Sequence, residues 1–318
     1  MVLTKPVAAP EIDEQVQRRI TQGTRDIKGA VFRLALLAAL LLSLLVIILL
    51  IWDILSDGWS VLSSGLWDFM RGTLRSQPDD PAIGISQGLR GTFWIAVSVV
   101  VLAFPLGIGA AIYLEEYAPR NRLTTFIELN IRNLAGVPSV VYGILGLTIF
   151  VQALDWFTNG PTLLAAGLTL AVLVLPIVII TASEAIRAVP NELREAGYGV
   201  GATQWEVIRS HVLPYAAPGI LTGTLLSLAR AIGEAAPLIL VGAITGRLAT
   251  EASLLDPSQL TERFTAMPIV ITRWATFPDR GFVPLTAAAI AVLLVFVLLM
   301  NTAAILLRNR FERKREGR

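Results

Sequence analysis

Long apolar stretches separated by shorter polar stretches dominate the chain. A helix needs about 20 predominantly apolar residues to cross the hydrocarbon core of a bilayer, and six stretches meet or approach that length. Single segments that cross a membrane are helical, because every backbone N–H and C=O must find a partner within the segment. We therefore predict an all-α integral membrane protein with six membrane-spanning helices, at residues 31–52, 92–114, 133–154, 162–181, 217–244 and 282–307.

Polar segments between these helices predict the organisation of the chain. The first apolar stretch is too long for a signal-peptide core and no small-residue cleavage site follows it, so we expect it to be retained. Two long polar segments interrupt the later part, a loop at 183–214 and an outer loop at 245–282. The predicted regions are an N-terminal tail (1–30), a first transmembrane helix (31–52), an outer segment (53–90), a core with five transmembrane helices (91–307) and a basic tail (308–318).

The distribution of Lys and Arg predicts the orientation in the membrane. Six spans place both termini and the loop at 183–214 on the same side, and the segments on that side carry 18 Lys and Arg residues against seven on the other. Because positive residues accumulate on the cytoplasmic side, we expect both termini and this loop in the cytoplasm. The net charge of +2 is then explained by topology, and no nucleic-acid partner is expected.

Residue usage excludes several kinds of chemistry. The chain has no cysteine and a single histidine, His211, so we expect no metal site and no catalytic residues. The three lysines, Lys5, Lys28 and Lys314, do not complete a G-x-x-x-x-G-K-[ST] motif. The sequence therefore predicts that this chain is not an enzyme, binds no cofactor and does not hydrolyse ATP itself.

The polar loop at 183–214 carries its own helix signals. Pro190 is typical of the first turn of a helix, where its missing N–H costs nothing, so we expect a helix over the segment NELREAG. Gly197, Gly199 and Gly201 follow it. They permit a bend that residues with a Cβ atom resist.

A second short helix is predicted after this bend. The segment from Thr203 to Glu206 fits a capping box, in which both side chains accept hydrogen bonds from backbone N–H groups at the helix start. We expect this helix to end near Leu213, because Pro214 disfavours helical geometry in the residue before it.

An apolar stripe runs along the second helix. Trp205, Ile208 and Val212 are spaced i, i+3 and i+7 and are expected to share one face. A helix of about ten residues is marginal alone in water, so the stripe needs something to pack against. A partner protein and the headgroup surface of the membrane both fit this pattern.

The loop resembles the cytoplasmic EAA loop of ABC-importer permeases. In that family the loop forms a coupling helix that sits in a groove of the ATPase subunit. The resemblance implies that the matching residues, with Trp205 and Ile208, couple this chain to an ATPase. The chain departs from the family pattern at two positions. It has Gly197 where the family has a second Ala, and His211 where the family has Ile. The matching residues are Glu195, Ala196, Gly201, Leu213 and Pro214.

Four further segments resemble the PstA-type permease subunits of phosphate ABC importers, at residues 106–119, 134–147, 219–238 and 301–311. The resemblance implies the fold of type I ABC importer permeases (MetI-like) in the bacterial inner membrane, with half of a translocation pathway for phosphate. It also implies a PstC-like permease partner, two copies of an ABC ATPase subunit that uses ATP and Mg, and an outer phosphate-binding protein.

Arg230 and Glu234 are the residues that point most directly to a substrate. They lie four residues apart within a predicted span, where ionisable side chains are costly and often mark a transport pathway. The planar guanidinium suits a phosphate oxyanion. Gly233 and Pro237 favour a break in the helix. The hydroxyl of Ser139 is a candidate hydrogen-bond donor to the same anion. An ion pair that only locks this helix to a neighbour is the alternative.

Other transport functions fit parts of this pattern. An arginine in a cavity does not select among oxyanions, so a permease for sulfate or molybdate is one alternative. A standalone secondary transporter coupled to protons through Glu234 is another, and it predicts transport without an ATPase.

Overall fold

A computed structural model describes residues 27–244 and 256–316. Within these ranges the secondary structure is helical, and a single isolated bridge joins Thr73 to Ile83. The predicted all-α fold is confirmed. The expected tail at 1–30 falls almost wholly outside the described residues, as does part of the outer loop. The chain divides into two units, Met1–Asp53 and Ile54–Arg318, which are treated separately below.

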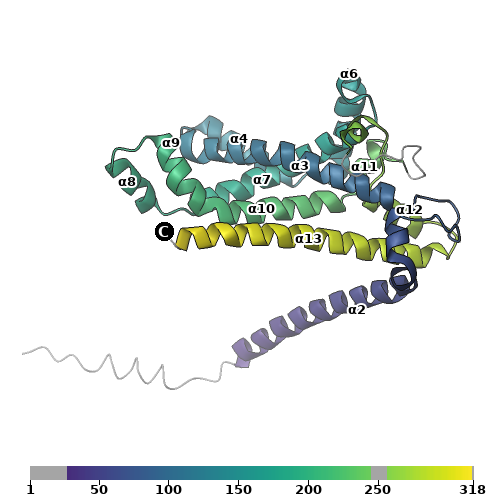
Figure 1. Cartoon of the computed structure of the whole chain (residues 1–318). Coiled ribbons are helices and arrows are strands. Elements are labelled where there is room, and N and C mark those ends of the chain that lie inside the picture. The colour runs from purple at the N-terminus through teal and green to yellow at the C-terminus, as the bar shows by residue number, and fades with distance from the viewer. Residues whose placement is uncertain (1–26, 245–255, 317–318) are drawn as a thin grey trace, which may run out of the picture. The chain divides into compact units, whose positions relative to one another are not determined.

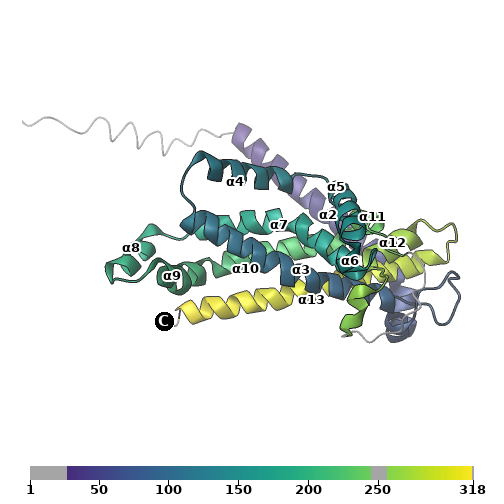
Figure 2. The same ribbon diagram turned by 90° about the horizontal axis from the view of Figure 1, so that it is seen from above.

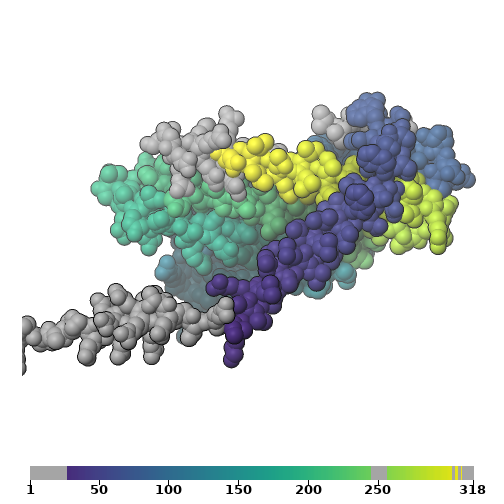
Figure 3. Space-filling view, turned by 90° about the horizontal axis from the view of Figure 1, so that it is seen from below, coloured from purple at the N-terminus to yellow at the C-terminus, as the bar shows by residue number. Residues whose placement is uncertain are grey.

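The described part of the first unit is the beginning of helix α2 (Ile27–Arg71), which contains the predicted first transmembrane helix. Its most apolar window has no buried residue, so apolar side chains are exposed all around it. The exposed surface of this helix is drawn in purple in the space-filling view (Figure 3). A helix that is apolar on every side is typical of a membrane span.

The second unit begins with the remainder of α2, so the expected outer segment at 53–90 starts as helix. Phe69, near the end of α2, is buried with Trp274 of α12 (Met267–Ala275) and with Phe282, the first residue of α13 (Phe282–Glu316). This cluster ties α2, α12 and α13 together. The expected basic tail at 308–318 continues α13 as far as Glu316.

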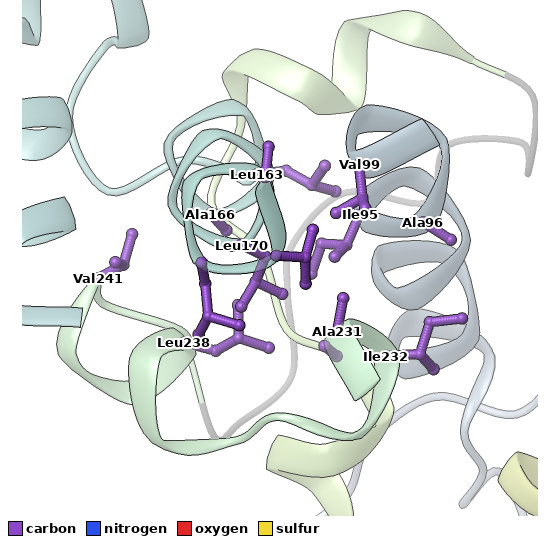
Figure 4. Close-up of a cluster of buried hydrophobic side chains, with 14 of the residues drawn as sticks. Ile95, Ala96, Val99, Leu163, Ala166, Leu170, Ala231, Ile232, Leu238 and Val241 are labelled. Atoms are coloured by element: carbon purple, nitrogen blue, oxygen red, sulfur yellow. The ribbon is translucent and has the colours of Figure 1, made fainter. Parts of the chain in front are cut away.

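Helix α7 (Leu163–Arg187) lies at the centre of the second unit, packed against α3 (Ser86–Ile112) on one side and α10 (Leu213–Gly233) on the other. Small residues allow these close contacts, as is common between membrane helices. A Cβ atom at Gly107 of α3 would come within 2.6 Å of Val178 Cγ1. Figure 4 shows the resulting core, with side chains of α3, α7, α10 and the following α11 turned toward one another.

Among the residues that the structure describes, five helices are long and apolar enough to cross a membrane, and a bent pair makes six if counted as one span. The pair is α4 (Arg122–Ala135) and α5 (Ser139–Gly146), the latter continued by the π-helix η2 (Leu147–Ala153). The two arms meet at 100°. The expected single helix at 133–154 is therefore wrong, because the segment Gly-Val-Pro before Ser139 interrupts the backbone hydrogen-bond ladder.

The expected span at 217–244 also differs. Helix α9 (Gln204–Val207), the π-helix η3 (Ile208–Val212) and α10 follow one another without a break, and the helix ends at Gly233 rather than at 244. Pro214 does not end the loop helix as expected. It lies at the start of α10, directly after the π-helix η3, where the backbone hydrogen-bond pattern changes and the chain continues as helix.

The two ends of the second unit carry different elements (Figures 1 and 2). Helices α8 (Asn191–Gly199) and α9 lie at one end together with the last turns of α13. Helix α12 lies at the other end. This arrangement agrees with the expectation that the loop at 183–214 and the C-terminal segment share one side of the membrane, and we call that side the loop end.

A segment at 264–266 is buried away from the loop end, although it is not helical. Phe264, Thr265 and Ala266 are at most 1% exposed. The Phe264 carbonyl accepts from the backbone N–H of Ile244 at 2.8 Å, and the N–H of Met267 donates to Thr92 Oγ1 at 2.8 Å. Non-helical backbone is tolerated at membrane depth only when protein covers it in this way.

Candidate functional site

The chain breaks its helical path immediately after Gly233. Glu234 has an extended backbone, with φ −81° and ψ 119°, and a short helix, α11 (Ala236–Leu240), resumes with Pro237 in its first turn. The predicted break at Gly233 and Pro237 is confirmed. Gly233 is exposed, and nothing else in the described chain lies within 4 Å of the position a Cβ atom would take. Backbone groups at the break are thereby accessible.

Arg230 and Glu234 form an ion pair across this break, with 3.5 Å between Arg230 Nε and Glu234 Oε1. The predicted proximity is confirmed, but Arg230 lies in the last turn of α10 rather than mid-helix. A positive charge there interacts favourably with the helix dipole. The Arg230 side chain is 46% exposed and that of Glu234 is 20% exposed. Arg230 lies in the last turn of α10 and Glu234 directly follows that helix, so the pair does not lock α10 to another helix.

Helix α5 packs beside the break. Gly143 lies against α11, where a Cβ atom would come within 2.8 Å of Pro237 Cα. The Tyr142 hydroxyl donates to the carbonyl of Leu134 at 2.9 Å, so Tyr142 joins the two arms of the bent pair. Ser139 is the first residue of α5 and is partly exposed, one turn before Gly143.

The loop at 183–214 folds into the two helices that the sequence predicts. The capping box is confirmed: Thr203 N donates to Glu206 Oε2 at 2.8 Å, and Glu206 N donates to Thr203 Oγ1. Of the three glycines, only Gly201 adopts a positive φ, +83°, and makes the bend. Gly197 belongs to α8 and serves a close approach, since a Cβ atom there would come within 2.8 Å of Val207 Cγ2.

The predicted apolar stripe of the second helix is only partly correct. Ile208 and Val212 are fully buried. Val212 belongs, with Val207, to a cluster that packs the loop onto the ends of α3 and α7. Trp205 is 54% exposed and does not share that surface. The buried face is centred on Val207 because α8 folds back against it at Gly197. Ile208 is therefore not part of the exposed surface of the loop.

The outer face of the loop is open. Glu195, Ala196, Gly201 and Pro214 are exposed, and Leu213 is partly buried. Three large side chains are exposed on the same loop, and they are Tyr198 at 45%, Val200 at 84% and Trp205 at 54%. Exposed apolar side chains grouped on a polar loop mark an interaction surface.

A cluster of charged residues that the sequence reasoning missed joins this loop to the helices. Arg194 of α8 donates to Glu116 Oε1 from Nη2 at 2.8 Å and from Nε at 3.2 Å. It also donates to the carbonyls of Val189 at 2.6 Å and Ile186 at 3.0 Å. The Glu116 side chain is only 6% exposed. Gln204 of α9 donates to the Glu116 backbone carbonyl.

A second ion pair lies beside the first. Arg187, at the end of α7, makes a bidentate contact with Glu115, at 2.6 Å and 3.2 Å. Both carboxylates come from the π-helix η1 (Tyr113–Tyr117), which ends α3. The Arg187 side chain is 53% exposed and borders a small cleft that Glu128 and Arg132 of α4 also line.

Comparison with known proteins places these features in a family. Residues 103–316 match the family described as Binding-protein-dependent transport system inner membrane component. The chain is 34% identical over 297 residues to Phosphate transport system permease protein PstA 1 of Mycobacterium tuberculosis (strain CDC 1551 / Oshkosh), covering 92% of each chain. It is 34% identical over 228 residues to Probable ABC transporter permease protein YqgI of Bacillus subtilis (strain 168), covering 70% of this chain and 76% of that one.

Solved structures share the fold at lower identity. A chain of the bacterial alginate ABC transporter, in complex with its alginate pentasaccharide-bound periplasmic protein, matches with a TM-score of 0.61 and 14% identity, covering 91% of this chain and 98% of that one. A chain of the MetNI methionine ABC transporter matches with a TM-score of 0.54 and 17% identity, covering 77% and 97%.

The curated relatives are named as transport permeases, so this chain is a subunit of an ABC transporter and not itself an enzyme. Its apolar helices agree with a multi-pass protein of the bacterial inner membrane. The predicted MetI-like permease fold is confirmed. The chain belongs to the family of binding-protein-dependent transport system inner membrane components and, within it, to the PstA-type permeases.

Proposed function

We propose that this chain is the permease subunit of an ATP-driven phosphate importer and forms half of its translocation pathway. The observation that carries the proposal is the half-exposed side chain of Arg230 at the break that follows α10. Relatives over most of the chain are named phosphate transport permeases, which supports phosphate as the anion.

The geometry of the break suits passage of an anion rather than tight capture. Glu234 approaches Arg230 through Nε, so the two terminal nitrogens can face an oxyanion in the bidentate manner typical of arginine. The Glu234 carboxylate limits the net positive charge of the site and can accept a hydrogen bond from the hydroxyl of monohydrogen phosphate. A pathway site must bind weakly enough to release its ion. Gly233 exposes backbone groups beside the pair, and Ser139 of α5 is a further candidate donor.

The outer face of the loop is the proposed docking surface for the ATPase on the cytoplasmic side. Glu195 and Ala196 are exposed there, as the resemblance to the EAA loop requires, and Trp205 adds an exposed aromatic anchor. Aromatic side chains often dominate binding energy at interfaces. The proposed assembly contains this chain, a PstC-like permease, two ATPase subunits and an outer phosphate-binding protein. ATP and Mg are used by the ATPase.

Uptake by the reconstituted complex tests the proposal. The two permease subunits are reconstituted in the membrane of proteoliposomes with the ATPase and ATP on the inside and the binding protein on the outside. Phosphate, sulfate or molybdate is then added outside. We expect ATP-dependent uptake of phosphate and little of the other two anions. Uptake of sulfate or molybdate in place of phosphate would assign the chain to another oxyanion importer.

A second arm tests the class of transporter. Vesicles that contain only this chain are given phosphate and a proton gradient, and no uptake is expected. Phosphate uptake under these conditions would show a standalone secondary transporter and would contradict the ABC assignment for this chain's mechanism.

A further inference from the structure

Arg194 joins three elements, α8, η1 and α7, through its hydrogen bonds. Its guanidinium lies on α8 and pairs with Glu116 of η1, which is continuous with α3. It also donates to the carbonyl of Ile186, in the last turn of α7, and to that of Val189, just after α7. The five N–H donors of arginine, set in a rigid plane, allow one side chain to satisfy partners in several directions.

The bonds to α7 act as a helix cap supplied by the next helix. The last carbonyls of a helix have no donor within the helix. A positive side chain near them is doubly favourable, since it donates hydrogen bonds and opposes the negative end of the helix dipole. Arg194 therefore closes the turn between α7 and α8 and fixes the direction in which α8 leaves the bundle.

A second tether reaches the same π-helix from α9, because Gln204 donates to the Glu116 backbone carbonyl. Beneath these polar bonds, Val189, Val207 and Val212 are buried against α3 and α7. Polar and apolar contacts thus hold the α8–α9 hairpin to the ends of both helices. The neighbouring Arg187–Glu115 pair differs, since it joins only α7 to η1 and its arginine is 53% exposed.

We propose that Arg194 is a positioning residue that makes the α8–α9 hairpin move as one body with α3 and α7. Movement of an ATPase bound at the hairpin then reaches the membrane helices instead of being absorbed in the turn at 188–190. This inference rests on the proposed function, because it assigns a step in coupling the ATPase to transport. Arg194 is 18% exposed, and it is not among the residues assigned to the substrate pathway or to the proposed ATPase surface.

The test compares Arg194→Met with the matched control Arg187→Met in the assembled, reconstituted transporter. ATP hydrolysed per phosphate transported is the readout, and co-purification of the ATPase is measured in parallel. For Arg194→Met we expect the ATPase to co-purify, hydrolysis to continue and the ratio to rise about tenfold or more, since a buried pair is broken. For Arg187→Met we expect a change within about twofold.

Two further variants separate positioning from folding. Arg194→Lys keeps the charge but not the planar fork, so an intermediate ratio is expected. If Arg194→Met does not assemble, Glu116→Gln keeps the size of the side chain and removes its charge, and we expect the ratio to rise about threefold. A wild-type ratio in Arg194→Met, or in Glu116→Gln where that variant replaces it, would overturn the inference.

An equal rise in Arg187→Met would also overturn it, because the effect would then follow any charge lost at this end. Wild-type transporter that imports phosphate without ATP, or imports none, would instead contradict the proposed function. The two failures are therefore distinguishable within one set of measurements.

Discussion

Arg194 and Arg230 are each paired with a glutamate, yet their surroundings differ. Arg194 at the loop end is 18% exposed and is bonded to a nearly buried Glu116 and to two backbone carbonyls. Arg230 at the helix break is 46% exposed, and its ion-pair partner, Glu234, lies four residues along the same chain. The first is surrounded by fixed protein partners, whereas the second presents much of its guanidinium to its surroundings.

We infer from this difference that the two arginines have different roles. A charge whose donors are all engaged by protein stabilises a local arrangement and is costly to remove. A charge that is half exposed at a helix break can exchange partners with a passing anion at little cost in stability. Exposure and the number of protein partners therefore distinguish the Arg194–Glu116 site, which we call the joint, from the proposed pathway site at Arg230 and Glu234. Both sites have the same residue types.

The largest loss of stability is expected at the joint. Arg194→Met leaves the Glu116 carboxylate buried without its cation and should destabilise the folded chain by about 3–5 kcal/mol. Thermal unfolding of the detergent-solubilised protein measures this loss. The neighbouring Arg187→Met, at a more exposed pair, should cost about 0–1 kcal/mol. Equal melting temperatures for the two variants would remove the contrast between a buried joint and an exposed pair.

A smaller effect is expected at the bend of the loop. Gly201→Ala should cost about 1–2 kcal/mol, because Gly201 has φ +83° and no steric contact adds to the backbone strain. Gly199→Ala is the matched control, since Gly199 ends α8 and also has open space around it. Alanine there should stabilise the chain by about 0.5–1 kcal/mol. Melting temperatures that shift in the same direction for both variants would contradict the assigned bend.

The smallest loss of stability is expected at the break. Arg230→Met should change the free energy of unfolding by about 0–1 kcal/mol, because an exposed pair four residues apart contributes little. Thermal unfolding beside Arg194→Met gives the direct comparison. A loss at Arg230 as large as that at Arg194 would show that the pair at the break is a structural element after all.

Local signals in the sequence were sufficient for several parts of the site. The capping box at Thr203 and Glu206 and the break after Gly233 depend on residues close together in the chain, and both are confirmed. The pairing of Arg230 with Glu234 follows from a spacing of four residues. Such features are governed by propensity and short-range hydrogen bonds, which a single sequence displays.

Features that depend on packing could not be predicted in this way. Arg194 and Glu116 are 78 positions apart, and nothing in their spacing indicates that α3 and α8 meet. The exposure of Trp205 depends on α8 folding back at Gly197 and burying Val207. Pro214 was expected to end a helix, yet the π-helix before it lets the chain continue into α10. In each case tertiary contacts override the local preference.

Phosphate uptake by the reconstituted transporter carrying Arg230→Met tests the central claim most directly. We expect uptake to fall about 100-fold, which corresponds to losing one hydrogen-bonding interaction with a charged group. The ATPase should co-purify with the variant in the same amount as with the wild type, because the loop end is unchanged. Wild-type phosphate uptake by this variant would contradict the placement of the pathway at the α10 break.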